Sequence, residues 1–296
     1  MPAGNGKMSE WSSRVAGAAQ PSWPSDFAVR GRADKRLRAL LGGYLVEAFV
    51  ASDIGGVRES NQDSIALLLP GDPSLCERRG LLAVVADGMG GHKGGEVASA
   101  LAVTAICRHY FAVDETPSHA LTLALREANN IVFRAAEADS RLAGMGTTAT
   151  ALALVDGQAL LAHVGDSRLY RCRDGQGHQL TTDDSLVVEM VNCGILSSEQ
   201  ARHHPARNVL VRSLGTQAKL WVVAKTDAPL AAGDCFVLCT DGLWESVDGG
   251  EMAEIVANMN VADAGRRLLA LARSRDGSDN LSVGVIAIRP PKKIAS

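Results

Sequence analysis

Four aspartates stand at the ends of apolar runs, where their side chains could meet and bind a cation. Asp63 comes just before a strand-like run, whereas Asp87 and Asp241 each follow one and are themselves followed by glycine. Asp279 lies in a polar loop just ahead of the last apolar run of the chain. If these strand ends gather at one edge of the sheets, four negative charges converge there.

Converging carboxylates repel one another, and burying them in charged form is costly unless a cation neutralises them. Oxygen ligands without His or Cys select hard ions such as Mg²⁺ or Mn²⁺. Gly88, directly after Asp87, would let an ion approach a backbone carbonyl without a side chain in the way. The sequence therefore predicts a divalent metal site, although a flexible loop alone would also explain the glycines of residues 88–95.

The alternative for each Asp-Gly pair is a plain turn, since the chain holds six such dipeptides and turns favour them. The pairs at Asp87 and Asp241 differ because no returning strand follows two residues later. The Asp87 pair instead leads through glycines into a predicted helix. This repeated form favours ligands over turns at these two positions.

Arg58 lies five residues before Asp63. An arginine can bind a phosphate through two parallel hydrogen bonds, although an exposed arginine on its own is usually only solvated. Beside a metal site, Arg58 indicates an enzyme that hydrolyses phosphate esters.

The elements that must position these residues alternate between strand-like and helical patterns. Tight hairpins are predicted at Asp156-Gly157 and Asp174-Gly175. Strand-like runs occupy residues 45–51, 64–69, 81–86, 149–155, 159–164, 168–172, 220–224, 235–239 and 281–288.

Three longer segments have helical character, at residues 94–110, at residues 260–273 and after Thr116-Pro117, which is a good helix start. Two strand groups, a helix pair between them and a helix at the end suggest an α+β fold of antiparallel sheet and helices. One buried helical face is formed by Leu121, Leu125, Ala128 and Val132.

The chain divides into an N-terminal extension, residues 1–43, and a folded domain, residues 44–296. Residues 1–31 are rich in Gly, Ser, Pro and Ala and are expected to be disordered. The basic stretch Arg32–Leu41 could be one helix with Gly42 and Gly43 as its C-cap. It could serve as a solvated lead-in or as a docking segment for a partner.

Composition excludes several functions. The net charge is −3 and no basic block dominates, so nucleic-acid binding is not expected. The six cysteines form no C-x-x-C pair, which argues against a thiolate zinc site. No secretory signal opens the chain and no apolar run could span a membrane, so a cytoplasmic protein is expected.

Six short motifs occur in order over residues 46–290. They are Val57-Arg58-Glu59-Ser60-Asn61-Gln62-Asp63, Val85-Ala86-Asp87-Gly88-Met89-Gly90-Gly91, Gly146-Thr147-Thr148, Val164-Gly165-Asp166-Ser167-Arg168, Thr240-Asp241-Gly242-Leu243-Trp244 and Gly277-Ser278-Asp279-Asn280. Together they resemble the metal-dependent protein phosphatases of type 2C, in their bacterial form.

The resemblance implies a four-layer α-β-β-α sandwich, with two antiparallel sheets flanked by antiparallel helix pairs. It implies removal of phosphate from phosphoserine and phosphothreonine in proteins. It also implies a cognate serine/threonine kinase, or the targets of that kinase, as partners.

By motif match, the resemblance implies that Asp87 bridges two Mn²⁺ or Mg²⁺ ions. Asp241 and Asp279 would hold one ion and the carbonyl of Gly88 the other, with Asp63 close by.

The resemblance further implies that Arg58 binds the substrate phosphate and that Asp166 helps to hold a third, weaker ion. Residues 180–215 resemble the mobile flap of the family. Within them, His203 and His204 are expected to be surface or packing residues rather than metal ligands.

Three positions depart from the family pattern. Met89 stands where eukaryotic members have a histidine thought to protonate the leaving group, which leaves His92 or a water as the acid. Gln62 replaces a common Glu and removes a negative charge near the metal. Asp184 replaces the His of many bacterial members, which affects the flap.

The predicted chemistry is in-line attack by a metal-activated water, with no covalent phosphoenzyme. The cysteines should then be dispensable, and no G-x-S-x-G motif supports a serine nucleophile. The competing hypotheses are a non-catalytic binding module on the same fold and a hydrolase of small phosphate esters. The first would be expected to lack metal aspartates, which this chain retains.

Overall fold

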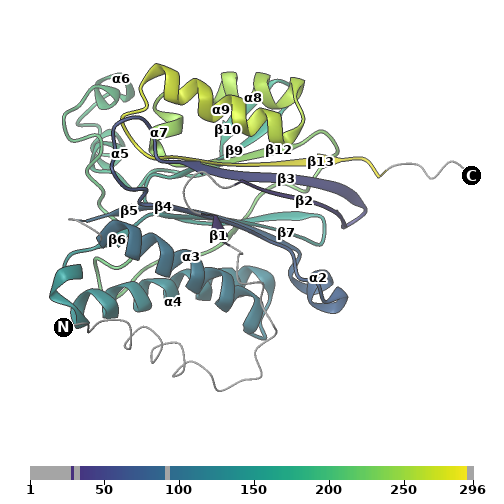
Figure 1. The fold of residues 1–296 in the computed structure, drawn as a ribbon, viewed down its shortest axis with the longest axis horizontal. Helices are drawn as coiled ribbons and strands as arrows, with labels where there is room; N and C mark the ends of the chain where they lie inside the picture. The colour runs from purple at the N-terminus through teal and green to yellow at the C-terminus, as the bar shows by residue number, and fades with distance from the viewer. Residues whose placement is uncertain (1–27, 30–33, 91–93, 292–296) are drawn as a thin grey trace, which may run out of the picture.

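The computed structural model describes residues 28–29, 34–90 and 94–291 of the chain. In this part, two antiparallel sheets lie face to face, and helices cover the outer face of each sheet (Figure 1). The α+β sandwich that the sequence predicts is therefore confirmed. None of the helices in the described ranges is long and apolar enough to cross a lipid bilayer.

The first sheet has the strand order β1-β4-β5-β7-β8-β11, and β6 pairs with the end of β5. Its strands are β1 (Ala28–Val29), β4 (Asp63–Leu68), β5 (Leu81–Met89), β6 (Gly146–Thr147), β7 (Ala149–Val155), β8 (Gln158–Val164) and β11 (Lys225–Thr226).

The second sheet has the order β10-β9-β12-β13-β3-β2, so its strands come from both ends of the folded chain. They are β2 (Asp34–Leu41), β3 (Tyr44–Asp53), β9 (Arg168–Arg173), β10 (Gln176–Gln179), β12 (Cys235–Cys239) and β13 (Leu281–Arg289).

Two pairs of helices form the outer layers (Figure 1). The first sheet packs against α3 (Gly94–Ala112) and α4 (Pro117–Ala138), and the second against α8 (Gly249–Asn258) and α9 (Val261–Arg275). The shorter helices are α2 (Pro73–Arg79), α5 (Leu186–Asn192), α6 (Ser198–Arg202) and α7 (Asp241–Trp244).

Strand β5 shows why the central runs are apolar throughout rather than alternating. Leu82 and Val84 point to the helices α3 and α4, whereas Ala83 and Val85 point into the core between the two sheets. Both faces of the strand are buried, so both sets of side chains must be apolar. This continuous run ends at Asp87, where the sheet reaches the edge of the molecule.

The predicted Thr116 cap and the two Asp-Gly hairpins are confirmed. The side chain of Thr116 accepts a hydrogen bond from the amide of His119 at the start of α4. Asp156 and Asp174 have positive φ angles of 51° and 52°, and the glycine after each is also at positive φ, as a type I′ turn requires. These turns join β7 to β8 and β9 to β10.

The helix predicted for Arg32–Leu41 is wrong, because Asp34–Leu41 forms strand β2 and pairs along its length with β3. Exposed and half-buried residues alternate along it with a period of two, which is a strand pattern. Gly42 and Gly43, at φ 54° and 81°, form the turn of this hairpin instead of a helix cap. The sheet therefore begins before residue 44. Within the predicted tail at residues 1–31, Ala28–Val29 form strand β1 and pair with β4, and the other residues lie outside the described part of the chain.

A strand predicted at residues 220–224 is also wrong. Only Lys225–Thr226 pair with β8. The preceding residues run along α4, where Arg126 donates to the carbonyl of Val222 and Thr122 accepts from the amide of Ala224. Side chains of the helix satisfy the backbone that a neighbouring strand would otherwise satisfy.

Candidate metal centre

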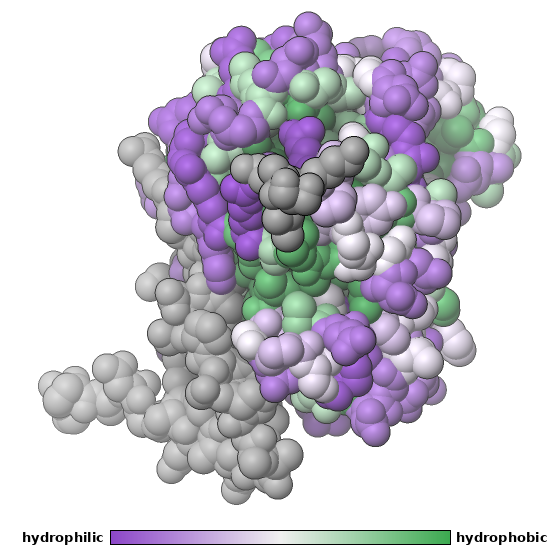
Figure 2. Space-filling view, turned by 90° about the vertical axis from the view of Figure 1, so that its right-hand side faces the viewer, coloured by the Kyte–Doolittle hydropathy of each residue, from purple (hydrophilic) through white to green (hydrophobic). Residues whose placement is uncertain are grey.

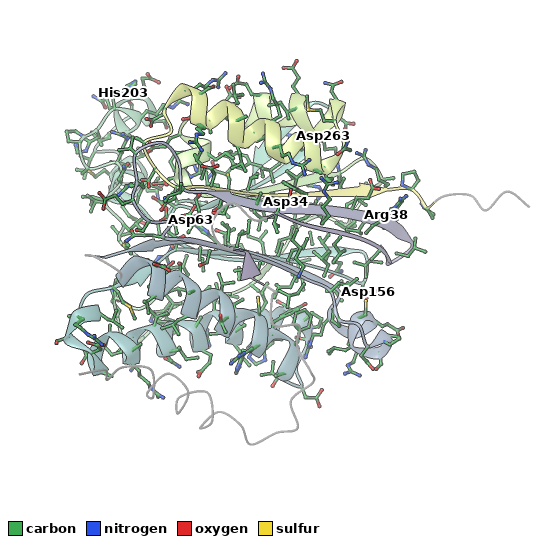
Figure 3. The ribbon with its side chains drawn as sticks, in the orientation of Figure 1. Asp34, Arg38, Asp63, Asp156, His203 and Asp263 are labelled. Carbon is green, nitrogen blue, oxygen red and sulfur yellow. The ribbon has the colours of Figure 1, made fainter. Side chains whose placement is uncertain are left out.

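The pairing of β4 with β5 places Asp63 directly opposite Asp87 at one end of the first sheet. Figure 3 shows Asp63 between the two sheets, at the end of the sandwich where α5, α6 and α7 lie. Asp241 begins α7, straight after β12, and Asp279 lies in the loop that leads into β13. The four aspartates therefore come from both sheets and lie at one end of the sandwich.

The carboxyl group of Asp63 links the two sheets. Its Oδ2 accepts hydrogen bonds from Thr240 Oγ1 at 2.8 Å and from Ser282 Oγ at 2.7 Å. Thr240 directly follows β12 and Ser282 lies in β13, both strands of the second sheet. Its Oδ1 is buried and has no hydrogen-bond partner, and Oδ1 of Asp241 is in the same condition. Two buried carboxylate oxygens without a partner are what a cation site would leave in the absence of the cation.

The backbone of Asp87 is fixed by hydrogen bonds with Thr147 and Thr148. Its amide donates to Thr148 Oγ1 at 2.8 Å, and its carbonyl accepts from the amide of Thr148 at 2.8 Å and from Thr147 Oγ1 at 2.7 Å. These contacts come from the end of β6 and the residue between β6 and β7, on the far side of β5 from Asp63. They fix the backbone of Asp87 without using its carboxyl oxygens.

Gly88 has no room for a side chain. A Cβ atom there would lie 2.0 Å from the carbonyl oxygen of Gly95 and 2.7 Å from that of Gln62. The end of β5 and the start of α3 can approach this closely only because residue 88 is glycine.

The charges of the cluster act on one another. Burial raises the pKa of Asp63 to about 7, and the charges of Asp241 and Asp279 add to the rise against hydrogen bonds from Ser282 and Thr240. Burial and then the charge of Asp241 raise the pKa of Asp87 well above its ordinary value. Carboxylates whose pKa values rise together are close enough to compete for protons, and a divalent cation would relieve that competition.

Asp241 and Asp166 complete the acidic cluster. Burial raises the pKa of Asp241 to about 6, with a contribution from the charge of Asp279 and an opposing hydrogen bond from Asp87. Burial raises the pKa of Asp166 to about 7, followed by the charge of Asp241. The turn between β8 and β9 thus brings Asp166 to the same end of the sandwich.

Arg58 lies at the solvent side of the cluster. Its Nη2 donates to Oδ2 of Asp279 at 2.6 Å, and about half of its side chain is exposed. The hydrogen bond with Asp279 raises the pKa of Arg58, and the charges of Asp87 and Asp241 act in the same direction. The guanidinium group is therefore held beside the acids and still has N–H groups for a ligand.

These residues fit a hard divalent cation by their chemistry. The donors are oxygens, and two of them are buried without partners. Among the described residues, no three Asp, Glu, His or Cys side chains are already spaced to coordinate one ion. Side-chain rotation would have to complete the shell, because uncompensated carboxylates repel one another.

Several residues near the site were not singled out from the sequence for a role there. Hydroxyl groups of Thr148, Thr240 and Ser282 bind the acidic residues, and Ser167 in turn bonds to Thr148. Only a strand-end hydroxyl pattern could have suggested them, and hydroxyls occur at many strand ends. Trp244 donates from Nε1 to the carbonyl of Asp166 at 2.9 Å.

The positions that depart from the family pattern, and the flap histidine His203, lie around the site or away from it. Met89 is half-buried at the end of β5, and His92 lies outside the described residues. Asp184 is buried and pairs with Arg212 in the flap. His203 is largely exposed at the outer edge of the flap and pairs with Glu199 (Figure 3).

The opposite end of the molecule has a different character. Figure 2 shows that face, where apolar residues lie between the two layers. A hollow there is lined mostly by apolar or small residues, including Leu40, Leu41, Cys76, Leu154 and Leu230. Such a lining suits packing rather than hydrolysis.

A family model described as protein phosphatase 2C matches residues 57–282. Protein phosphatase PhpP of Streptococcus pneumoniae is 33% identical over 253 residues, which cover 82% of this chain and 98% of that protein. A crystal structure of the Mycobacterium tuberculosis serine/threonine phosphatase PstP/Ppp aligns with a TM-score of 0.73 at 33% identity, covering 82% of this chain and 99% of that one. A structure of the PstP catalytic domain in complex with two manganese ions aligns with a TM-score of 0.69 at 32% identity, covering 82% and 98%.

Proposed function

Since this chain belongs to the protein phosphatase 2C family and is a serine/threonine protein phosphatase, we propose that it hydrolyses phosphoserine and phosphothreonine at a centre of two divalent ions held by Asp87, Asp241 and Asp279. The observation that carries the proposal is the meeting of these acids with Asp63 and Arg58 at one end of the two sheets. The carbonyl of Gly88 would be a further ligand, and Asp166 would hold a third, weaker ion. The ions would be Mn²⁺ or Mg²⁺, in keeping with the oxygen-only donor set.

When bound, the ions supply an activated water near neutral pH and positive charge for the phosphoryl oxygens. The chain supplies the positions. The carboxyl group of Asp63 accepts hydrogen bonds from Thr240 and Ser282, which tie the start of β4 to the second sheet. The fixed backbone of Asp87 directs its carboxyl group to the same point.

Arg58 would orient the substrate. Asp279 holds one side of the guanidinium group, and the exposed N–H groups would bind two phosphoryl oxygens and stabilise their charge during in-line attack. Met89 has no proton to donate. The acid that protonates the leaving oxygen would be His92 or a water molecule.

The test compares Asp87→Asn and Asp241→Asn with the wild type on a phosphothreonine peptide in Mn²⁺. Loss of several kcal/mol of transition-state stabilisation predicts a fall in kcat of at least about a thousandfold in each variant. EDTA should stop the wild-type enzyme and added Mn²⁺ should restore it. Asp156→Asn is the matched control, because Asp156 lies in a hairpin turn at the other end of the molecule and Asn suits that turn (Figure 3).

Near-normal turnover of either site variant, with circular dichroism like the wild type, would refute the site assignment. A parallel assay with p-nitrophenyl phosphate separates a protein phosphatase from a hydrolase of small esters. We further propose that the physiological substrates are targets of a cognate serine/threonine kinase, or that kinase itself. Phosphoproteomes of a deletion strain and its parent, compared in the presence and absence of the kinase, test this.

A further inference from the structure

The turn that carries Asp166 is anchored by the base of the flap. The amide of Gly165 donates to Oδ2 of Asp184 at 3.1 Å, and the carbonyl of Gly165 accepts from the amide of Asp184 at 2.7 Å. Asp184 also pairs with Arg212 at the other end of the flap. These contacts fix the residue before Asp166.

A second anchor comes from the opposite side, through α7. The indole Nε1 of Trp244 donates to the carbonyl of Asp166 at 2.9 Å. Trp244 ends the short helix that Asp241 begins. This one hydrogen bond therefore joins the segment of Asp241 to the turn of Asp166.

The indole ring is itself held in place. The guanidinium carbon of Arg168 lies 3.3 Å from the centroid of the Trp244 ring. Arg168 also binds the buried carboxylate of Asp183 through Nε at 3.0 Å and Nη2 at 2.7 Å, and it donates to the hydroxyl of Tyr170. A guanidinium group fixed at two edges presents a rigid plane, so the ring stacked on it cannot tilt freely.

We propose that Trp244, held flat by Arg168, is a positioning residue that keeps Asp166 in place to bind the third cation. The inference rests on the proposed function, because it takes Asp166 as a ligand. The hydrogen bond from Trp244 to the carbonyl of Asp166 fixes the backbone at that residue. It thereby also fixes the direction in which the carboxyl group of Asp166 points. Without the donor, Asp166 has to be ordered by the ion itself, which weakens binding of that ion.

The Trp244→Phe variant removes the N–H donor and keeps an aromatic ring over Arg168. The loss of one net hydrogen bond predicts an increase of about threefold to tenfold in the Mn²⁺ concentration that half-fills the weak site. The two tighter ions do not depend on this bond and should be unaffected. Trp221→Phe is the matched control, because Trp221 is 80% exposed and belongs to another segment.

The readout is a count of bound Mn²⁺ from the electron paramagnetic resonance signal of the free ion, together with kcat and KM over a range of Mn²⁺. We expect a shifted weak step in Trp244→Phe, an unshifted tight step, and a kcat that recovers at high Mn²⁺ with unchanged KM. Arg168→Lys, which loses the planar fork, should shift the same step. Asp166→Asn should remove it.

Weak steps that superimpose in the wild type and Trp244→Phe would overturn the inference, and so would equal weakening of all ions. The proposed function fails separately, if the EDTA-treated wild type binds no Mn²⁺ or remains active. A thermal melt of each variant identifies one that is not folded, and in that case the Arg168→Lys titration decides.

Discussion

At the scale of single residues, some of the acids of the candidate metal centre are buried and short of hydrogen-bond partners. Asp63 and Asp241 each bury one oxygen without a partner, and the pKa of Asp63 is raised to about 7 and that of Asp241 to about 6, by burial first. Buried acids of this kind either take up protons or bind a cation. Both reactions change the melting temperature of the protein, which can be measured against pH and against Mn²⁺.

The first residue-scale prediction concerns pH and the metal-free protein. An aspartate with a raised pKa binds protons more tightly folded than unfolded, where its pKa is about 3.9. Its contribution to stability is therefore complete below about pH 4 and is lost as the pH rises to about 7. In EDTA, the melting temperature should fall between pH 5 and pH 7.5, and Mn²⁺ at pH 7.5 should raise it.

The Asp63→Asn variant tests the cause. With no charge to bury at residue 63, its melting temperature in EDTA should depend less on pH than that of the wild type. A melting temperature that rises between pH 5 and pH 7.5 in EDTA would contradict the assignment of these acids as buried and uncompensated.

The second residue-scale prediction concerns Arg58. Arg58→Ala should lower kcat/KM for a phosphothreonine peptide by about tenfold to a hundredfold, because hydrogen bonds to a charged phosphate contribute about 1.5–3 kcal/mol. Arg58→Lys should recover part of this loss, since it keeps the charge without the two-pronged geometry. Arg141→Ala is the control, because Arg141 is exposed and pairs locally with Asp139. Equal kinetics for Arg58→Ala and the control would remove Arg58 from the site.

At the scale of elements, most of the longer strands and the helices α3, α4 and α9 were predictable because each has a strong local signal. The buried face of α4, its Thr116 cap and the two Asp-Gly hairpins follow from spacing and turn chemistry alone. Strand β2 was not predictable in this way, because a basic segment ending in two glycines suits a helix as well as a hairpin. The segment forms a strand because it pairs with β3, and the local sequence does not indicate which strand a segment will pair with.

The centre shows the same division. The position of four aspartates at strand ends is visible in the sequence, so these residues could be named as ligand candidates. They are Asp63, Asp87, Asp241 and Asp279. Their meeting depends on how two sheets pack, and the contacts of Trp244 with Asp166 and of Asp184 with Gly165 join segments far apart in the chain. Such long-range contacts are not written in the spacing of any one segment.

The element-scale prediction concerns the joint between β9 and β12. Burial alone would raise the pKa of Asp234, but hydrogen bonds from Arg173 and Arg171 lower it. The carboxyl group is fully buried, and Arg171 is nearly so. Asp234→Asn should therefore lower the free energy of unfolding by about 3 kcal/mol, because it leaves a buried arginine short of its partner.

Urea unfolding at pH 7 measures this loss, and Asp227→Asn is the matched control. Asp227 pairs with the same arginine but is more exposed, so its replacement should cost about 1 kcal/mol or less. Because the pKa of Asp234 is lowered, its contribution is present above about pH 4 and disappears on acidification. Equal costs for the two variants would show that burial of Asp234 does not matter.

At the scale of the whole molecule, most of the cysteines are buried, and Cys239 ends β12 two residues before Asp241. Cys107, Cys172, Cys235 and Cys239 are buried, and burial raises the pKa of Cys172 to about 12. Cys193, in the flap, is exposed. The thiolate form that a nucleophile needs is therefore suppressed at the buried positions.

The whole-molecule prediction is resistance to alkylation. Iodoacetamide at pH 7.5 should modify Cys193 first, as mass spectrometry would show, and leave turnover in Mn²⁺ unchanged. Cys193→Ser should behave like the untreated enzyme. Loss of activity in step with modification of a buried cysteine would instead support a thiol mechanism.

Asp63 belongs to one sheet and takes its hydrogen bonds from residues of the other. The candidate centre therefore lies across the interface between the two sheets, and the distances between its acids depend on how the sheets are placed relative to each other. The apolar side chains between the sheets, Phe236 and Ile286 among them, set the separation of the sheets and so the distances between the acids at their edge. A change of side-chain volume deep in that interior would move one layer over the other and displace the acids of the candidate centre without replacing any of them.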